Sequence, residues 1–317
     1  MTNFRVNYLY VVIVFMSSIV IAGCSTTKLT VNQTVKVFAK ASKTYDKEAD
    51  LMLADAGIRS NLKTFEGLRE IVPENQRLMT LTARSFASYA FGFVEDKMEA
   101  ASAVGDFQTE SEMRARAIDY YGRSKRSGLR ALSKVNSKFP EALDGAPEKL
   151  ERALKGFKKK HVPALFWTAY AWGRSINLQQ DNPMLLVDLA NVEMMMRRVI
   201  ELDESFYFGG AHLFFSAYYG SRSPQLGGNP EKVKQHLQKV DEINNGKFQF
   251  SKLFLARYYA YPLQDRALYE RTLQEIIDAP IDVFPEHRIS TAIAKARAKR
   301  WLAQTDDVFG EAVDHDE

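Results

Sequence analysis

The chain has 317 residues and a formal net charge of +4, and 46% of its residues are hydrophobic. These values exclude a disordered chain, and the near-balanced charge leaves no basic footprint for nucleic acid, so no nucleic-acid partner is expected. Cys24 is the single cysteine, so packing rather than disulfide bonding must hold the core.

The N-terminal residues have the layout of a secretory signal peptide. Arg5 is followed by an apolar run from Tyr8 to Ala22, which is shorter than the roughly 20 residues of a membrane-spanning helix. A permanent transmembrane anchor is therefore the weaker interpretation.

The apolar run ends in Ile21-Ala22-Gly23-Cys24, which resembles the lipobox of bacterial lipoproteins. We predict a lipoprotein signal peptide over residues 1–23 and lipid attachment at Cys24, where several acyl chains would anchor the mature chain to a membrane. The alternative is a fortuitous cysteine after an ordinary signal peptide. Ser25 stands where lipoproteins of an inner membrane often have Asp, which favours a periplasm-facing site on the outer membrane.

The mature chain is predicted to be all-α. Its 17 glycines and 10 prolines are few for this length, and apolar residues recur with helical spacing. We predict a polar tether over residues 24–30, one helical-repeat domain over 31–304 and an acidic disordered tail over 305–317, where Lys and Arg are absent.

Within this domain the first two predicted helices form an antiparallel hairpin. One spans 51–71 and stops before Pro73, and the other begins near Asn75. The next helical region, 111–139, is rich in Arg and Lys.

Three later segments share one pattern, in which Leu-Phe is followed by an aromatic-rich helix: residues 165–171, 213–219 and 253–259. Each precedes a loop signal and an amphipathic helix, and Asn182-Pro183 and Asn229-Pro230 are typical helix starts. A helix-turn-helix unit with a period of roughly 40–50 residues indicates a stacked, tetratricopeptide-like solenoid. The alternative is a helical bundle with accidental similarity. A last helix over 285–302 is predicted to close the array.

Several stretches, taken in order and spacing, resemble the TatT component family associated with tripartite ATP-independent periplasmic (TRAP) transporters. They are Tyr89–Glu95, Phe166–Gly173, Gly210–Phe214, Leu226–Pro230, Ala256–Ala260 and Phe284–Glu286. The resemblance extends over about residues 45–309. It implies a tetratricopeptide-like periplasmic lipoprotein that associates with the solute-binding subunit of a transporter. It does not imply a catalytic reaction, and it gives no role for the basic run Lys158-Lys159-Lys160. We predict no cofactor.

Aromatic side chains of the repeated helices are the candidate lining of a ligand or partner cleft. Core packing is the plainer interpretation for any one of them. Adjacent tyrosines diverge by about 100° around a helix, so the two members of a Tyr-Tyr pair cannot face the same core, and one can face a cavity. The candidates are Trp167, Tyr170, Trp172, Tyr218, Tyr219, Tyr258 and Tyr259.

No catalytic or metal-binding pattern is recognisable. The histidines at 161, 212, 236 and 287 lack the short spacing of a metal motif, and no nucleophile elbow or carboxylate pair stands out. We therefore predict that the protein is not an enzyme and that it binds no metal.

Two functions follow from the sequence. The first is an interaction module that docks a solute-binding protein near a membrane and could assemble as a homo-oligomer. The second is a ligand-handling protein that holds an organic acid or apolar solute in an aromatic cleft or channel.

Overall fold

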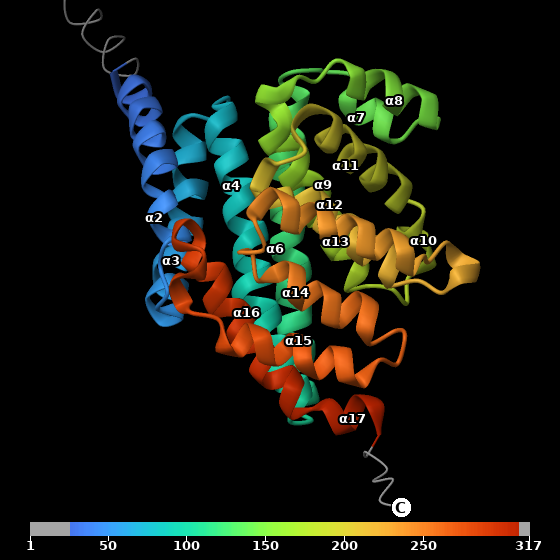
Figure 1. The fold of residues 1–317 in the computed structure, drawn as a ribbon. Helices are drawn as coiled ribbons and strands as arrows, with labels where there is room; N and C mark the ends of the chain where they lie inside the picture. Colours follow the sequence, from blue (N-terminus) through green and yellow to red (C-terminus); the bar gives the residue numbers. More distant parts are fainter. Residues whose placement is uncertain (1–25, 311–317) are drawn as a thin grey trace, which may run out of the picture.

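The computed structural model describes residues 26–310, and within this range every regular element is a helix or helical turn (Figure 1). The predicted all-α class is therefore confirmed. The predicted signal peptide, Cys24 and the end of the acidic tail lie outside the described residues.

The chain forms one unlabelled helix over 26–41 and then a series of helices. In order these are α2 (Lys43–Asp46), α3 (Leu51–Ile71), α4 (Gln76–Tyr89), α5 (Glu95–Ala103), α6 (Phe107–Ser133), α7 (Phe139–Leu143), α8 (Pro147–Lys155), α9 (Val162–Asn177), α10 (Pro183–Leu186), α11 (Leu189–Asp203), α12 (Phe206–Gly220), α13 (Pro230–Asn244), α14 (Phe250–Leu255), α15 (Arg266–Asp278), α16 (Arg288–Ala303) and α17 (Thr305–Phe309). Two π-helical turns, η1 (Ala90–Val94) and η4 (Ala256–Ala260), continue α4 and α14.

Polar caps fix where the helices begin. Asn75 and Asp265 each accept a hydrogen bond from a backbone N–H of the first turn of the helix that follows, which satisfies donors that a helix start leaves free. Asn182 and Asn229 cap α10 and α13 in the same way, each with proline at the first helical position, as the sequence predicts.

The boundaries differ from the prediction at both ends of the domain. The described part of the predicted tether, 26–30, belongs to the first helix rather than to an extended linker. The predicted tail begins with α17, because Phe309 packs on Tyr269 with ring centroids 5.1 Å apart and Arg266 binds Asp306 at 2.6 Å.

Successive helices pack side by side along most of the chain. Contacts run from α3 through α4, α6, α9 and α11 to α12, and each of the three repeated segments forms the first helix of a helical pair: α9 with α11, α12 with α13, and α14 with α15. Helix α16 then returns to the beginning and contacts α2, α3 and α5. The described chain is therefore a helical bundle in which the last long helix lies against the first ones (Figure 1).

Two contacts hold this return in place. The Arg297 guanidinium, buried in the core, donates to the carbonyl of Phe91 at 2.6 Å, and Arg300 donates to Asp96 at 2.6 Å. Hydrogen bonds to charged groups are stronger than neutral ones, so α16 is joined firmly to η1 and α5.

Candidate functional site

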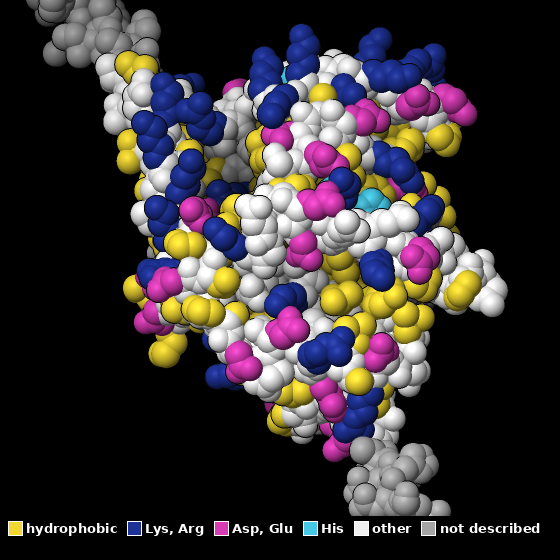
Figure 2. Space-filling model, in the orientation of Figure 1, with side chains coloured by type: hydrophobic (Ala, Val, Ile, Leu, Met, Phe, Trp, Pro, Cys, Tyr) yellow, Lys and Arg dark blue, Asp and Glu magenta, His cyan; other side chains and the backbone are white. Residues whose placement is uncertain are grey.

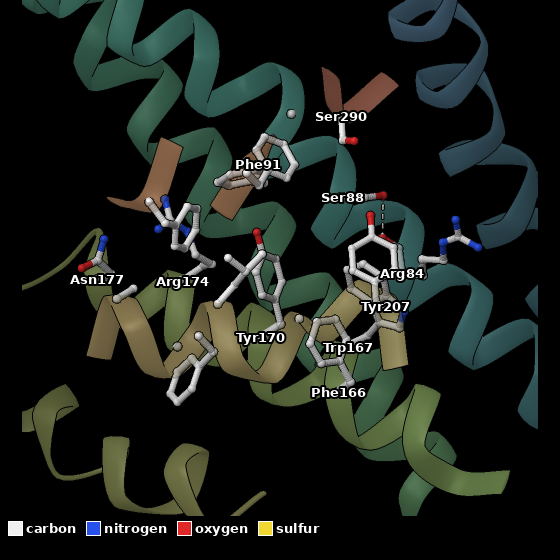
Figure 3. A pocket seen from close by; sticks show the side chains of 18 of the residues that line it. Arg84, Ser88, Phe91, Phe166, Trp167, Tyr170, Arg174, Asn177, Tyr207 and Ser290 are labelled. Carbon is white, nitrogen blue, oxygen red and sulfur yellow. Dashed lines mark hydrogen bonds between the residues drawn. The ribbon is translucent and has the colours of Figure 1, made fainter. Parts of the chain in front are cut away.

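A cavity of about 590 Å³ lies in the middle of the bundle and is lined mainly by apolar and aromatic side chains. Residues from α3, α4, η1, α9, α12, α14, η4 and α16 contribute to its wall. This volume falls within the range of pockets that hold small organic ligands. Figure 3 shows Tyr170 in the middle, with Arg174 and Asn177 toward one end and Arg84, Ser88 and Tyr207 toward the other.

The structure places four of the seven candidate aromatic residues in this wall: Trp167, Tyr170, Tyr218 and Tyr258. Trp167 and Tyr170 are three residues apart and therefore share a face of α9. In the two Tyr-Tyr pairs among the candidates, 218–219 and 258–259, the first tyrosine lines the cavity and the second does not.

The other three candidates make different contacts. The indole N–H of Trp172 donates to Asp188 at 3.1 Å, and Lys125 lies 3.4 Å from the centre of a Trp172 ring. Tyr219 stacks on His236 with an interplanar angle of 11°. Tyr259 is partly buried against the main core.

Several residues of the wall were not predicted from the sequence, notably Arg84, Phe91, Arg174, Tyr207 and His287. Phe91 lies in one of the stretches that carry the family resemblance, so that signal was present. The arginines gave no signal, because nothing in the sequence distinguishes them from arginines on a solvated helix face.

An unusual backbone turn brings Tyr207 to the cavity. Tyr207, Phe208 and Gly209 have φ values of 48°, 62° and 78°, a left-handed conformation that costs roughly 1–2 kcal/mol for a residue with a side chain. Ring contacts offset this strain, because Tyr207 packs on Trp167 at 4.7 Å and Phe208 on Phe284 at 4.9 Å.

A close helix contact follows directly after this turn. A Cβ at Gly210 would lie 2.6 Å from the Phe166 ring, so only glycine allows α12 to approach α9 this closely.

A buried ion pair lies at one end of the cavity. Glu95 is 1% exposed and accepts hydrogen bonds from the Tyr121 hydroxyl and from two nitrogens of Arg174. Burial acts to lower the pKa of Arg174, but Glu95 raises it well above its ordinary value, so Arg174 stays charged. Because the Glu95 carboxylate neutralises the charge of Arg174, this end of the cavity is polar without being strongly cationic.

The opposite end holds a second pair. Arg84 donates to both carboxylate oxygens of Asp46, at 2.6 and 2.7 Å, and His287 Nε2 lies 3.5 Å from Asp46. Burial raises the pKa of Tyr207 and of Tyr170, so both hydroxyls keep their protons and remain hydrogen-bond donors. The cavity is therefore an aromatic chamber with hydrogen-bonding groups at both ends.

Comparison with known proteins assigns the family. The family model described as "TRAP transporter T-component" matches residues 47–309. The chain belongs to the TRAP transporter T-component family. A protein of Treponema pallidum (strain Nichols), which carries the name "Uncharacterized protein", is 22% identical over 311 residues, covering 93% of this chain and 96% of that relative.

The family assignment confirms the resemblance found in the sequence and places the cavity within the family's matched region, apart from Ser42, Tyr45 and Asp46. The T-component family is a class of transporter component rather than a class of enzyme. None of the helices within 26–310 is both long and apolar enough to span a bilayer, and no group of three or more metal-ligand side chains occurs in that range.

The burial of His287 leads us to expect that the stability of this T-component depends on pH. The side chain is 3% exposed, and burial lowers its pKa to about 4. A histidine whose pKa is depressed by folding stabilises the protein above the unfolded pKa of about 6.5 and loses that contribution as the pH falls toward the folded value. We expect a loss of about 2 kcal/mol between pH 7 and pH 5 from this group.

Chemical denaturation of the wild type and of His287→Phe at both pH values measures this loss. The variant should show a smaller decrease in unfolding free energy than the wild type, because it lacks the buried imidazole. His212 and His236 remain in both proteins, so their contribution to the pH dependence is the same in the two. An equal decrease in the two proteins would assign the pH dependence to other groups.

Proposed function

We propose that this T-component is a lipid-anchored accessory protein that docks the solute-binding subunit of a TRAP-type transporter. Family membership over residues 47–309 is the observation that carries the proposal. The lipobox-like sequence before Cys24 supports a periplasm-facing anchor, with the outer membrane favoured by Ser25. The serial packing of helical pairs supports a tetratricopeptide-like ancestry of the bundle. We propose no catalytic step for this role.

The mouth of the cavity is the best-supported docking position. Three residues of the cavity wall come from this region: Leu186 from the end of α10, and Arg222 and Leu226 from the segment between α12 and α13. Leu226 is 74% exposed, and the neighbouring Met184 is 76% exposed. Exposed apolar side chains grouped beside a cavity are typical of a protein interaction site.

A binding experiment with the purified solute-binding subunit tests docking. We expect a complex at micromolar concentration, and we expect Leu226→Asp to weaken it by roughly tenfold or more because a charge replaces a buried contact. Met52→Asp is the matched control, since Met52 is 85% exposed on α3. No complex at micromolar concentration, or equal losses in the two variants, would contradict the proposal.

A second candidate function is ligand handling, which the cavity itself favours. An aromatic chamber with polar ends suits an elongated, largely apolar molecule that carries a polar or anionic terminus. Native mass spectrometry of the protein purified from its own host would reveal a co-purifying small molecule of this kind, and its consistent absence would favour docking alone.

A further inference from the structure

Positive charge is concentrated in two segments of the chain. Residues 26–47 contain five lysines and one aspartate, and residues 134–160 contain eight lysines or arginines and four acidic residues. Each segment therefore has a net charge of +4. Because the whole chain also has a net charge of +4, the remaining residues are net negative.

The structure brings the start of the first segment and the second segment to one end of the bundle, which we call the basic end, while Ser42, Tyr45 and Asp46 reach the cavity. Asn75 at the start of α4 donates to Asn32 of the first helix at 2.6 Å, and the adjacent Glu74 forms an ion pair with Lys134 at the end of α6. The ring of Phe139 in α7 lies 5.1 Å from that of Phe157, just before Lys158. The first helix and the α7–α8 region are thus linked through the α3–α4 turn.

The space-filling view shows the same concentration. Lysine and arginine side chains follow the upper edge of the molecule over α7 and α8 and continue along the first helix (Figure 2). Lys138, Lys149, Lys158 and Lys160 are exposed, and within residues 26–310 none of the four takes part in an ion pair. Elsewhere several exposed lysines are paired, as Lys239 is with Glu242 at 2.8 Å.

The chain reaches the basic end from its proposed lipid anchor. Thr26 is the first residue that the structure describes, it already belongs to the first helix, and it stands two positions after Cys24 in the sequence. Two residues of fully extended chain span at most about 7 Å. A lipid on Cys24 would therefore hold the start of this helix within about one headgroup layer of the membrane.

We propose that the basic end lies against anionic phospholipid headgroups. The inference rests on the proposed lipid anchor and adds an orientation to it. Each lysine near an anionic membrane surface contributes roughly 1 kcal/mol to binding. The charges of the basic end are spread over several elements rather than gathered in one pocket, and this arrangement suits binding to a flat, charged membrane surface. In this orientation α10 and the loop between α12 and α13, which contribute Leu186 and Leu226 to the cavity wall, lie to the side of the bundle and stay open to a partner (Figure 1).

Vesicle binding by the chain from Ser25 to Glu317 tests the proposal without the lipid. This chain retains both hydrophobic cores described by the structure, which begin at Val35. We expect it to bind vesicles of phosphatidylcholine with about 30% phosphatidylglycerol, to bind pure phosphatidylcholine weakly, and to be released as salt shortens the Debye length to about 3 Å.

The triple variant Lys158→Glu, Lys159→Glu, Lys160→Glu should bind the anionic vesicles roughly tenfold or more weakly. The matched control is Lys234→Glu, Arg271→Glu, Lys299→Glu, which makes the same charge change at exposed positions outside both segments and should bind more tightly than the first triple. Thermal unfolding confirms that both variants are folded.

Equal binding to neutral and anionic vesicles, or equal losses in the two triple variants, would overturn the orientation. Binding to the solute-binding subunit through Lys158-Lys159-Lys160, with no binding to vesicles, would also overturn it and would assign the basic end to a protein partner. Because the vesicle assay contains no transporter subunit, it can succeed or fail independently of the docking experiment.

Discussion

Replacing Glu95 by Gln is expected to destabilise the protein by about 3–5 kcal/mol, which is the usual cost of breaking a buried ion pair. The substitution keeps the size of the buried Glu95 side chain but leaves the charged Arg174, whose side chain is only 16% exposed, without its carboxylate. The Tyr121 hydroxyl also loses a charged acceptor. The midpoint of denaturant-induced unfolding measures the effect.

Two further variants identify the cause. Glu110→Gln removes the carboxylate of a pair with Arg114 at 2.6 Å, in which the arginine side chain is 42% exposed against 16% for Arg174. It should cost less than about 1 kcal/mol. The double variant Glu95→Leu, Arg174→Leu removes both buried charges and should be more stable than Glu95→Gln. If Glu95→Gln were no more costly than Glu110→Gln, the buried pair would contribute little to the fold.

Replacing Ala217 by Trp is expected to weaken ligand binding in the cavity by roughly 100-fold. The indole would fill part of the cavity, so a ligand would lose apolar contacts equivalent to the burial of a few methylene groups. Ala217 lies in the wall on α12, between Phe214 and Tyr218. An anilinonaphthalene sulfonate dye is a suitable probe, because it joins an aromatic body to an anionic group. Its fluorescence in titrations of the wild type and the variant gives both affinities.

Ala267→Trp is the control for a new surface indole, because Ala267 is exposed on α15 outside the cavity wall. It should leave the affinity for the dye unchanged. Undiminished dye binding by Ala217→Trp would place the dye elsewhere on the protein and would remove the support for a ligand-holding chamber.

The helical pairs were predictable because the signals that specify them are local. The Leu-Phe segments at 165, 213 and 253 mark α9, α12 and α14, and Asn-Pro pairs mark the starts of α10 and α13. Apolar periodicity and capping residues act within a few turns, so a single sequence contains all the information that they require.

The site was only partly predictable, since its wall depends on how distant helices meet. Tyr170 and Trp172 are both aromatic residues of the same stretch of α9, yet Tyr170 lines the cavity and Trp172 donates a hydrogen bond to Asp188. The left-handed turn at Tyr207 and Phe208 contradicts local preference and is maintained by tertiary ring contacts. No pattern of neighbouring residues could show that Arg84 would meet Asp46 across 38 positions of the chain.

The return of α16 to the first helices also has a consequence for biogenesis. Ile289, Ser290 and Ile293 complete the wall of the cavity, and Arg288 donates to the carbonyl of Lys47, 241 positions earlier in the sequence. If the chain is exported from its N-terminus, as the proposed signal peptide implies, nearly all of its length must cross the membrane before the cavity can close. Contacts of such separation slow folding, so the aromatic side chains of the cavity wall would stay open to solvent, or to chaperones, until α16 docks.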